Sequence, residues 1–432
     1  MRVKGTNILK ITASAAVAAV LLVVVPVSPV TAAEKESGGW ARQFGTRVAD
    51  EALGVALDGA GNAYVAGWTF GTLAGQRSAG MVDAFVRKYD AAGREVWTRQ
   101  FGSAERDFAR AVAADGVGNA YVVGETWGSL PGQRSAGGYD AFVRRYDPAG
   151  TEVWTRQFGG GGGEGAWGVA IDPAGGAYVV GTTRAALPGQ APAGGFDAFV
   201  ARYDAAGNQV WAAQFGTPGD EGGHGVALDP SGNVLVVGST DLVLPGETSA
   251  GGFDAYLRQY DRAGREGWTR QFGSTADDFG VAVAVDADGN AVVAGSADRA
   301  LPGQTWAGGT DAFLRSFDGA GTTLWTSQFG TTSTDAAWGV AIDRAGQTHV
   351  VGSTERELPG QRAAGGTDIF VRRYTGGREV RTHQFGTQET DMAFAVAVDD
   401  TGARLVGSTS GALSGRDSTS TGDRDAIIVL AG

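Results

Sequence analysis

Seven acidic residues recur at a nearly constant spacing along this 432-residue chain. They lie 57 residues apart, except in the last step, which is 56. A ring of such carboxylates could hold Ca²⁺ or a basic group, or supply acid and base for cleaving a glycosidic bond. Each could instead accept hydrogen bonds from loop N–H groups, which requires no ligand. The positions are Asp50, Asp107, Glu164, Glu221, Asp278, Asp335 and Asp391.

A second position, three residues further on, differs between the copies. Residues common to every copy are required by a repeated scaffold, so a position that varies is the better candidate for function. It is occupied by Leu53, Arg110, Trp167, His224, Val281, Trp338 and Phe394.

The tryptophans divide in the same way. Six share one repeated position, where we expect them to pack between repeats: Trp40, Trp97, Trp154, Trp211, Trp268 and Trp325. Arg381 replaces the seventh and indicates a weaker unit. Five others occupy no repeated position: Trp68, Trp127, Trp167, Trp306 and Trp338. We expect these in long connections on one face, together with Phe70, as a binding surface; the alternative is that they pack beneath their own loops.

The elements that position these residues repeat with the Gln-Phe-Gly triplet, which occurs seven times between Gln43 and Gln384. Within one unit, residues 54–58 and 62–67 read as two strands joined by a tight turn containing Asp58. A third strand is predicted over 83–89 and a fourth over 95–101. The third is apolar on both faces and must be covered on both sides.

Seven four-stranded units with two apolar faces can bury them by packing radially against one another. The sequence therefore predicts an all-β fold over residues 40–432, a seven-bladed β-propeller with four antiparallel strands per blade. The repeat opens with a lone fourth strand, 40–44, and closes with a third strand, 425–430. We expect the N-terminal strand to close the last blade, which removes an open sheet edge.

These residues resemble the SBBP (seven-bladed β-propeller) repeat of bacterial exported and cell-surface proteins. The resemblance rests on the segments 61–67, 83–90 and 93–102 and on their copies. It implies an extracellular propeller and brings no catalytic motif. Blade seven departs most, with Ser414-Gly415 where most other blades read Leu-Pro-Gly-Gln.

The N-terminus has the pattern of a secretory signal peptide over residues 1–32, followed by a short linker over 33–39. Its apolar run, 11–25, is too short for a membrane span, so we expect a mature chain without a transmembrane segment, exported to the cell surface, the extracellular space or the periplasm. Removal of residues 1–32 leaves 32 basic and 47 acidic residues. That balance argues against nucleic acid as a partner. We expect a monomer.

Few chemistries remain. The chain has no cysteine, and its three histidines fall at different strand positions, which argues against a histidine-based metal site or a serine triad. We therefore predict a non-catalytic binding, adhesion or scaffold module for a glycan or a surface protein, with no cofactor unless Ca²⁺ occupies the acidic ring. The alternative is a glycan-active hydrolase or lyase. The predicted ligand-binding residues are Trp68, Phe70, Arg110, Trp127, Trp167, His224, Trp306, Trp338 and Phe394.

Overall fold

The computed structural model describes residues 40–413 and 422–431. The expected signal peptide and linker, residues 1–39, lie outside this part, as does the departure at Ser414-Gly415. The described residues form 28 strands. They include no helix long and apolar enough to cross a membrane.

The strands fall into four sets by their position in a blade. The first strands are β2 (Asp50–Leu57), β6 (Asp107–Ala114), β10 (Glu164–Ile171), β14 (Glu221–Leu228), β18 (Asp278–Val285), β22 (Asp335–Ile342) and β26 (Asp391–Asp399). The second are β3 (Ala63–Thr69), β7 (Ala120–Thr126), β11 (Ala177–Thr183), β15 (Val234–Thr240), β19 (Ala291–Ala297), β23 (Thr348–Thr354) and β27 (Gly402–Thr409). The third are β4 (Asp83–Tyr89), β8 (Asp140–Tyr146), β12 (Asp197–Tyr203), β16 (Asp254–Tyr260), β20 (Asp311–Phe317), β24 (Asp368–Thr375) and β28 (Asp425–Ala431). The fourth are β5 (Glu95–Phe101), β9 (Glu152–Phe158), β13 (Gln209–Phe215), β17 (Glu266–Phe272), β21 (Thr323–Phe329), β25 (Arg378–Phe385) and β1 (Ala41–Phe44).

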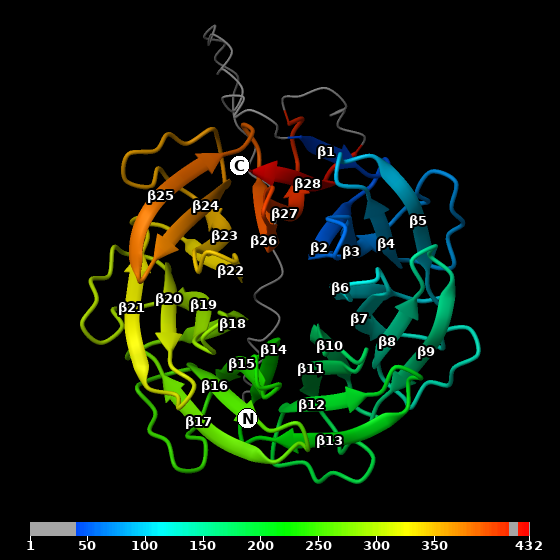
Figure 1. The fold of residues 1–432 in the computed structure, drawn as a ribbon, viewed down its shortest axis with the longest axis horizontal. Coiled ribbons are helices and arrows are strands. Elements are labelled where there is room, and N and C mark those ends of the chain that lie inside the picture. Colours follow the sequence, from blue (N-terminus) through cyan, green and yellow to red (C-terminus); the bar gives the residue numbers. More distant parts are fainter. Residues whose placement is uncertain (1–39, 414–421, 432) are drawn as a thin grey trace, which may run out of the picture. The chain divides into compact units, whose positions relative to one another are not determined.

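One first, one second, one third and one fourth strand together form an antiparallel sheet. The seven sheets are the blades of a closed ring. The first strands lie innermost and the fourth strands outermost (Figure 1). Apolar side chains of adjacent blades form shared cores; Tyr64 and Trp97 of blade one, for example, pack with Val112, Phe142 and Tyr146 of blade two. The predicted seven-bladed propeller is therefore confirmed.

The ring closes through the two ends of the described chain. β1 pairs antiparallel with β28, and Ala41 lies opposite Val429. The backbone N–H of Leu430 donates to the carbonyl of Trp40 at 2.8 Å. The prediction that the N-terminal strand completes blade seven is confirmed.

The predicted bounds of the first and second strands were wrong, by one residue at the turn that joins them and by more at their far ends. The first strand begins at Asp50, four residues before the predicted start, and the second strand extends through Thr69, two residues beyond the predicted end. The polar residues at these strand ends are buried, so the apolar alternation that served for prediction does not extend to them. The third and fourth strands have the predicted bounds.

The glutamine of each triplet ties its blade together. Gln100 Nε2 donates to Asp83 Oδ2 at 2.6 Å and to the carbonyl of Gly71 at 2.8 Å, while its Oε1 accepts the N–H of Leu73 at 2.9 Å. The same glutamine-to-aspartate bond, between 2.6 and 3.0 Å long, recurs in every blade. One side chain thus anchors the long loop and the third strand to the fourth.

The phenylalanine and glycine connect each blade to the next. The Phe101 ring meets Phe142 of blade two edge-on at 5.7 Å, with the Arg144 guanidinium 4.1 Å from its centre. At Gly102, a Cβ atom would lie 2.5 Å from Asp107 Oδ2 and 2.8 Å from Asp83 Oδ1. Only glycine leaves room for both carboxylates at this junction.

The repeated tryptophans also join neighbouring blades. Trp97 lies against Gly150, in the turn between the third and fourth strands of blade two, and its Nε1 donates to the carbonyl of Pro148 at 3.1 Å. Arg381 occupies this position in blade six. The third and fourth strands of blade seven, β28 and β1, come from opposite ends of the repeat region and have no connecting turn, so a tryptophan there would have no turn to cover.

Replacing Gly102 with alanine tests the junction. The new Cβ must displace Asp107 or Asp83, so we expect Gly102→Ala to lower the free energy of unfolding by about 1–3 kcal/mol in urea denaturation. The matched control is Gly116→Ala, where a Cβ would have no heavy atom within 4 Å, and we expect a change within about 0.5 kcal/mol. Equal effects of the two substitutions would contradict the steric argument.

Candidate functional site

The seven phased carboxylates lie at strand ends, where they are shielded from solvent. Each is the first residue of a first strand and is fully buried. In six blades the carboxylate accepts the backbone N–H of the residue four positions earlier at 2.5 or 2.6 Å, as Asp107 does from Ser103. In the seventh, Glu164 accepts the Thr183 hydroxyl at 3.2 Å. The structure thus gives these residues the loop hydrogen bonds considered as the alternative to ligand binding.

Each of these carboxylates lies beside another from the preceding blade, as Asp278 lies beside Asp254 at Gly273. Burial raises the pKa of Asp278 to about 7; hydrogen bonds from Ser274 oppose this rise, and the charge of Asp254 adds to it. Burial likewise raises the pKa values of the other six. Within the described part of the chain, no group of three or more His, Cys, Asp or Glu residues is arranged to hold a metal ion.

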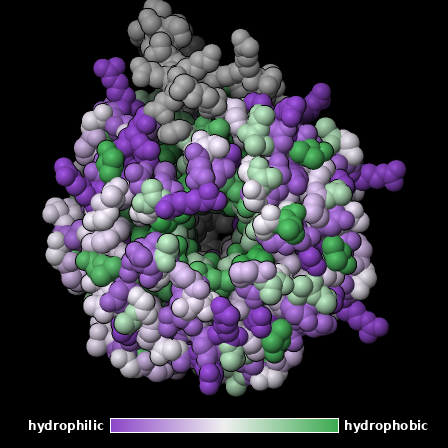
Figure 2. Space-filling model, viewed as in Figure 1, coloured by the Kyte–Doolittle hydropathy of each residue, from purple (hydrophilic) through white to green (hydrophobic). Residues whose placement is uncertain are grey.

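The variable position is a β-bulge. In every blade the register between the first and second strands shifts at this residue, so that it has no partner opposite. All seven bulge residues are half-buried. They lie on the innermost strands, around the hole at the centre of the ring, where hydrophobic side chains gather (Figure 2). Bulges commonly redirect side chains toward functional sites.

Arg110, the bulge residue of blade two, contacts two aromatic rings and a carboxylate. Its guanidinium is 4.8 Å from the centre of the Trp167 ring and 5.0 Å from that of Phe108. Its Nε lies 3.0 and 3.1 Å from the two carboxylate oxygens of Glu125. The charge of Arg110 is therefore already neutralised, and the side chain supports the neighbouring rings.

The remaining bulge residues make similar contacts. Trp338 Nε1 donates to the Ser353 hydroxyl at 3.0 Å, and its ring lies 6.3 Å from that of Phe394 in the next blade. His224 Nδ1 is 2.9 Å from the carbonyl of Gly280, also in the next blade. Burial lowers the pKa of His224, which this hydrogen bond partly opposes. Arg110, His224 and Trp338 thus each have a polar atom already bonded within the protein.

A second group of predicted residues forms an exposed surface on the long-loop face of blades one and two. Phe70 and Trp127 immediately follow strands β3 and β7 and are 50% and 51% exposed. Met81, in the loop before β4, is 54% exposed. The Arg106 guanidinium lies 5.9 Å from the Trp127 ring, which stacks on Tyr139 at 5.6 Å. We call Phe70, Met81, Arg106, Trp127 and Tyr139 the loop-face patch.

Backbone and ring contacts connect the blade-one and blade-two parts of this face. The N–H of Met81 donates to the carbonyl of Glu105 at 3.0 Å, which joins the blade-one loop to the start of blade two. Trp68 meets Phe70 at 5.4 Å and Phe108 at 5.8 Å, both edge-on. The backbone bond and the Trp68–Phe108 contact thus join the loop face of blade one to the start of blade two.

The expectation that all five unrepeated tryptophans lie in loops was wrong for three of them. Trp68, Trp167 and Trp338 are on strands, because the first and second strands are longer than predicted. Trp306 lies in a loop of blade five, away from the patch, where its Nε1 donates to the carbonyl of Gly309 at 3.0 Å. Sequence reasoning missed Met81, Arg106 and Tyr139, although all three occupy positions that differ between blades.

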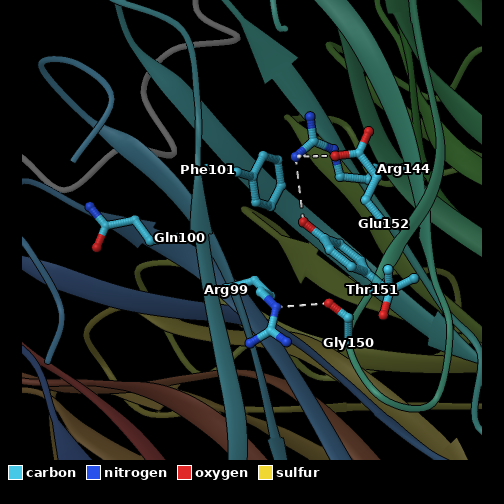
Figure 3. A pocket seen from close by; sticks show the side chains of 8 residues that line it. Arg99, Gln100, Phe101, Arg144, Gly150, Thr151 and Glu152 are labelled. Atoms are coloured by element: carbon cyan, nitrogen blue, oxygen red, sulfur yellow. Dashed lines mark hydrogen bonds and ion pairs between the residues drawn. The ribbon is translucent and has the colours of Figure 1, made fainter. Parts of the chain in front are cut away.

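A hollow of about 430 Å³ lies between the outer strand of blade one and blade two (Figure 3). Arg144 reaches Glu152 at 3.5 Å, and Arg99 donates to the carbonyl of Gly150 at 2.8 Å. The Arg144–Glu152 pair has counterparts in three other blades. Because its polar groups recur with the repeat, this hollow belongs to the scaffold.

Comparison with known proteins agrees with the repeat architecture. The SBBP β-propeller repeat matches residues 39–73, 96–131 and 210–242. The regulatory protein FlaEY of Caulobacter vibrioides is 30% identical over 184 residues, which is 39% of this chain. The chain spans only 19% of the length of that relative.

Solved propellers are similar at low sequence identity. The WD40 domain of Neurospora crassa Pan2 is 9% identical, with 88% of this chain and 89% of that one aligned and a TM-score of 0.47. The β-propeller domain of the Trilobed protease from Pyrococcus furiosus is 7% identical, with 88% and 93% aligned and a TM-score of 0.48.

The buried carboxylates predict a pH effect on stability. The folded-state pKa of Asp278, about 7, exceeds the value of about 3.9 expected in the unfolded chain. Between these values the folded state retains a proton that the unfolded state has lost. The contribution of Asp278 is therefore complete below about pH 4 and is lost as the pH rises toward 7, by up to about 1.4 kcal/mol per pH unit.

We expect Asp278→Asn to flatten the dependence of unfolding free energy on pH in this range, measured by urea denaturation from pH 4 to 8. Asp288→Asn, in an exposed turn, is the control and should leave the profile unchanged. A profile that Asp278→Asn leaves as steep as before would show that this carboxylate is ionised in the folded protein.

Proposed function

We propose that this chain, a β-propeller of the SBBP repeat family, is a non-catalytic module that binds another protein through the loop-face patch. The observation that carries the proposal is the exposure of Phe70, Met81 and Trp127, each at least half exposed and all on the long-loop face of blades one and two. Exposed, contiguous apolar side chains usually mark an interaction surface. The scaffold leaves these positions free to vary because they lie outside the repeated junctions.

The composition of the patch favours a protein over a glycan. Phenylalanine, methionine, tryptophan, tyrosine and arginine are the residues enriched at the centres of protein interfaces. All five are present here, and the Arg106 guanidinium lies near the Trp127 ring. A central tryptophan beside an arginine is the arrangement expected of residues that dominate a binding energy.

The burial of the phased carboxylates supports a non-catalytic role. Acid and base residues must reach the substrate, directly or through one water molecule. The seven carboxylates that the hydrolase alternative would use have no exposed surface. At the bulge ring, Arg110 is paired with Glu125, and His224 is bonded to the backbone.

The proposed cellular setting follows from the N-terminal pattern. A signal peptide over residues 1–32 would export the chain, so its partner would be a protein of the cell surface or the surrounding space. The mature net charge, with 32 basic and 47 acidic residues, suits a partner that is not strongly acidic.

The test is site-specific photocrosslinking in the organism of origin. A photoreactive residue at Met81 should give one discrete crosslinked protein product, identified by mass spectrometry. The same residue at Val117, which is exposed on the opposite, short-turn face, should not. In binding assays with the identified partner, Trp127→Ala should raise Kd by about tenfold or more.

Two results would overturn the proposal. One is crosslinking of the same products from Met81 and from Val117, which would indicate non-specific contact. The other is retention of the purified chain on a glycan array that Trp127→Ala abolishes, which would identify the ligand as carbohydrate. The double substitution Val96→Ser and Val153→Ser, on exposed outer-strand positions, is the control for loss of exposed apolar surface in general.

A further inference from the structure

Where blades one, two and three each meet the next blade, three features fill the junction on the short-turn face. At the junction of blades one and two, these are the Tyr64 ring, the Trp97 ring and the turn that joins β8 to β9. The Tyr64 hydroxyl donates to the carbonyl of Gly118 at 2.7 Å, and Trp97 Nε1 donates to that of Pro148 at 3.1 Å. Carbonyls of such turns also accept bonds from a cation on the third strand: Arg145 donates to Ala205 at 2.8 Å at the next junction.

All three features are missing between blades six and seven. His349 replaces the tyrosine, and its Nε2 lies 3.1 Å from Asp343 Oδ2 in its own blade. Arg381 replaces the tryptophan. No turn connects the third and fourth strands of blade seven. The result is a cavity of about 580 Å³, here called the blade-seven cavity.

Three carboxylates line the blade-seven cavity, and two of them are paired with an arginine. Asp343 lies beside His349, and Asp400 pairs with Arg344. Asp399 pairs with the buried Arg404 at 2.7 Å.

Arg373 also lines the cavity and, unlike Arg344, is not paired with a carboxylate in the described part of the chain. It is half-buried and has no hydrogen-bond or ion-pair partner among the residues that the structure describes. Its counterparts in blades two and three are engaged, Arg145 with the next turn and Arg202 with Asp172 at 3.1 Å. Arg373 is therefore the lining arginine whose guanidinium is available to a ligand.

We propose that the blade-seven cavity binds a small carboxylate that also carries hydrogen-bond donors, such as a sugar acid or an amino acid. The guanidinium of Arg373 matches a carboxylate in charge and geometry. The carboxylates of Asp343, Asp399 and Asp400 accept hydrogen bonds from the hydroxyl or ammonium groups of the ligand and disfavour a dianion such as phosphate. The volume suits a small molecule. This site is independent of the loop-face patch, which lies on the opposite face.

Isothermal titration calorimetry of the purified mature chain tests the proposal. Sodium glucuronate and glycine are the two probes, sodium phosphate is the comparison anion, and ionic strength is held constant. We expect at least one of the two carboxylates to bind and phosphate to bind at least tenfold more weakly. Which probe binds distinguishes a sugar acid from an amino acid.

Three variants separate the site from the fold. Arg373→Gln should weaken carboxylate binding by about tenfold or more. Arg145→Gln, at the filled junction of blades two and three, should leave binding unchanged. His349→Tyr should fill the cavity as tyrosine does in blades one to three and abolish binding, without lowering the melting temperature. Absence of carboxylate binding, equal binding of phosphate, or binding unaffected by both Arg373→Gln and His349→Tyr would overturn the proposal.

Discussion

The structure depends on the hydrogen bond between the triplet glutamine and the first aspartate of the third strand. Gln100 and Asp83 show why: this bond holds the end of the fourth strand against the long loop, and the chain must then turn past two buried carboxylates into the next blade. Buried carboxylates are costly unless they are hydrogen-bonded or protonated. The glutamine amide supplies such a bond in every blade, and loop N–H groups supply others, as at Asp83 and Asp107. The same bond from Gln43 to Asp425 helps to close the ring across 382 residues.

This junction also determines where variation is tolerated. Residues that build it cannot change in one blade without leaving a buried charge unsatisfied. The bulge residue and the residue after the second strand lie outside the glutamine–aspartate bond and the glycine contact, so each blade can carry a different side chain there, as Trp127 and Arg184 do. A nearly symmetrical scaffold thereby carries an asymmetrical surface, with exposed aromatic rings concentrated on blades one and two.

The period of the sequence predicted the fold and the bounds of the third and fourth strands, because Asp90 and Gly93 mark the turn between them unambiguously. It did not predict that Asp50 begins a strand, since polar residues at a buried strand end break the apolar alternation. Subtracting the repeated residues identified Phe70 and Trp127 but also included Trp167 and Trp338, which are half-buried and internally bonded. Exposure depends on which neighbours a loop brings near, and no local pattern encodes that.

Residues that depart from the repeat near the closure of the ring have a structural explanation that departures elsewhere do not have. Taken by itself, Arg381 looks like the loss of a core tryptophan, and His349 looks like an unrelated substitution. Together with the hairpin of blade seven, which is one residue shorter than that of blade two, they surround a single missing turn. A tryptophan without that turn would expose a large ring. The closure of the ring by strands from opposite ends is therefore the physical cause of the exception at Arg381, and it leaves Arg373 without the turn carbonyl that Arg145 reaches in blade three.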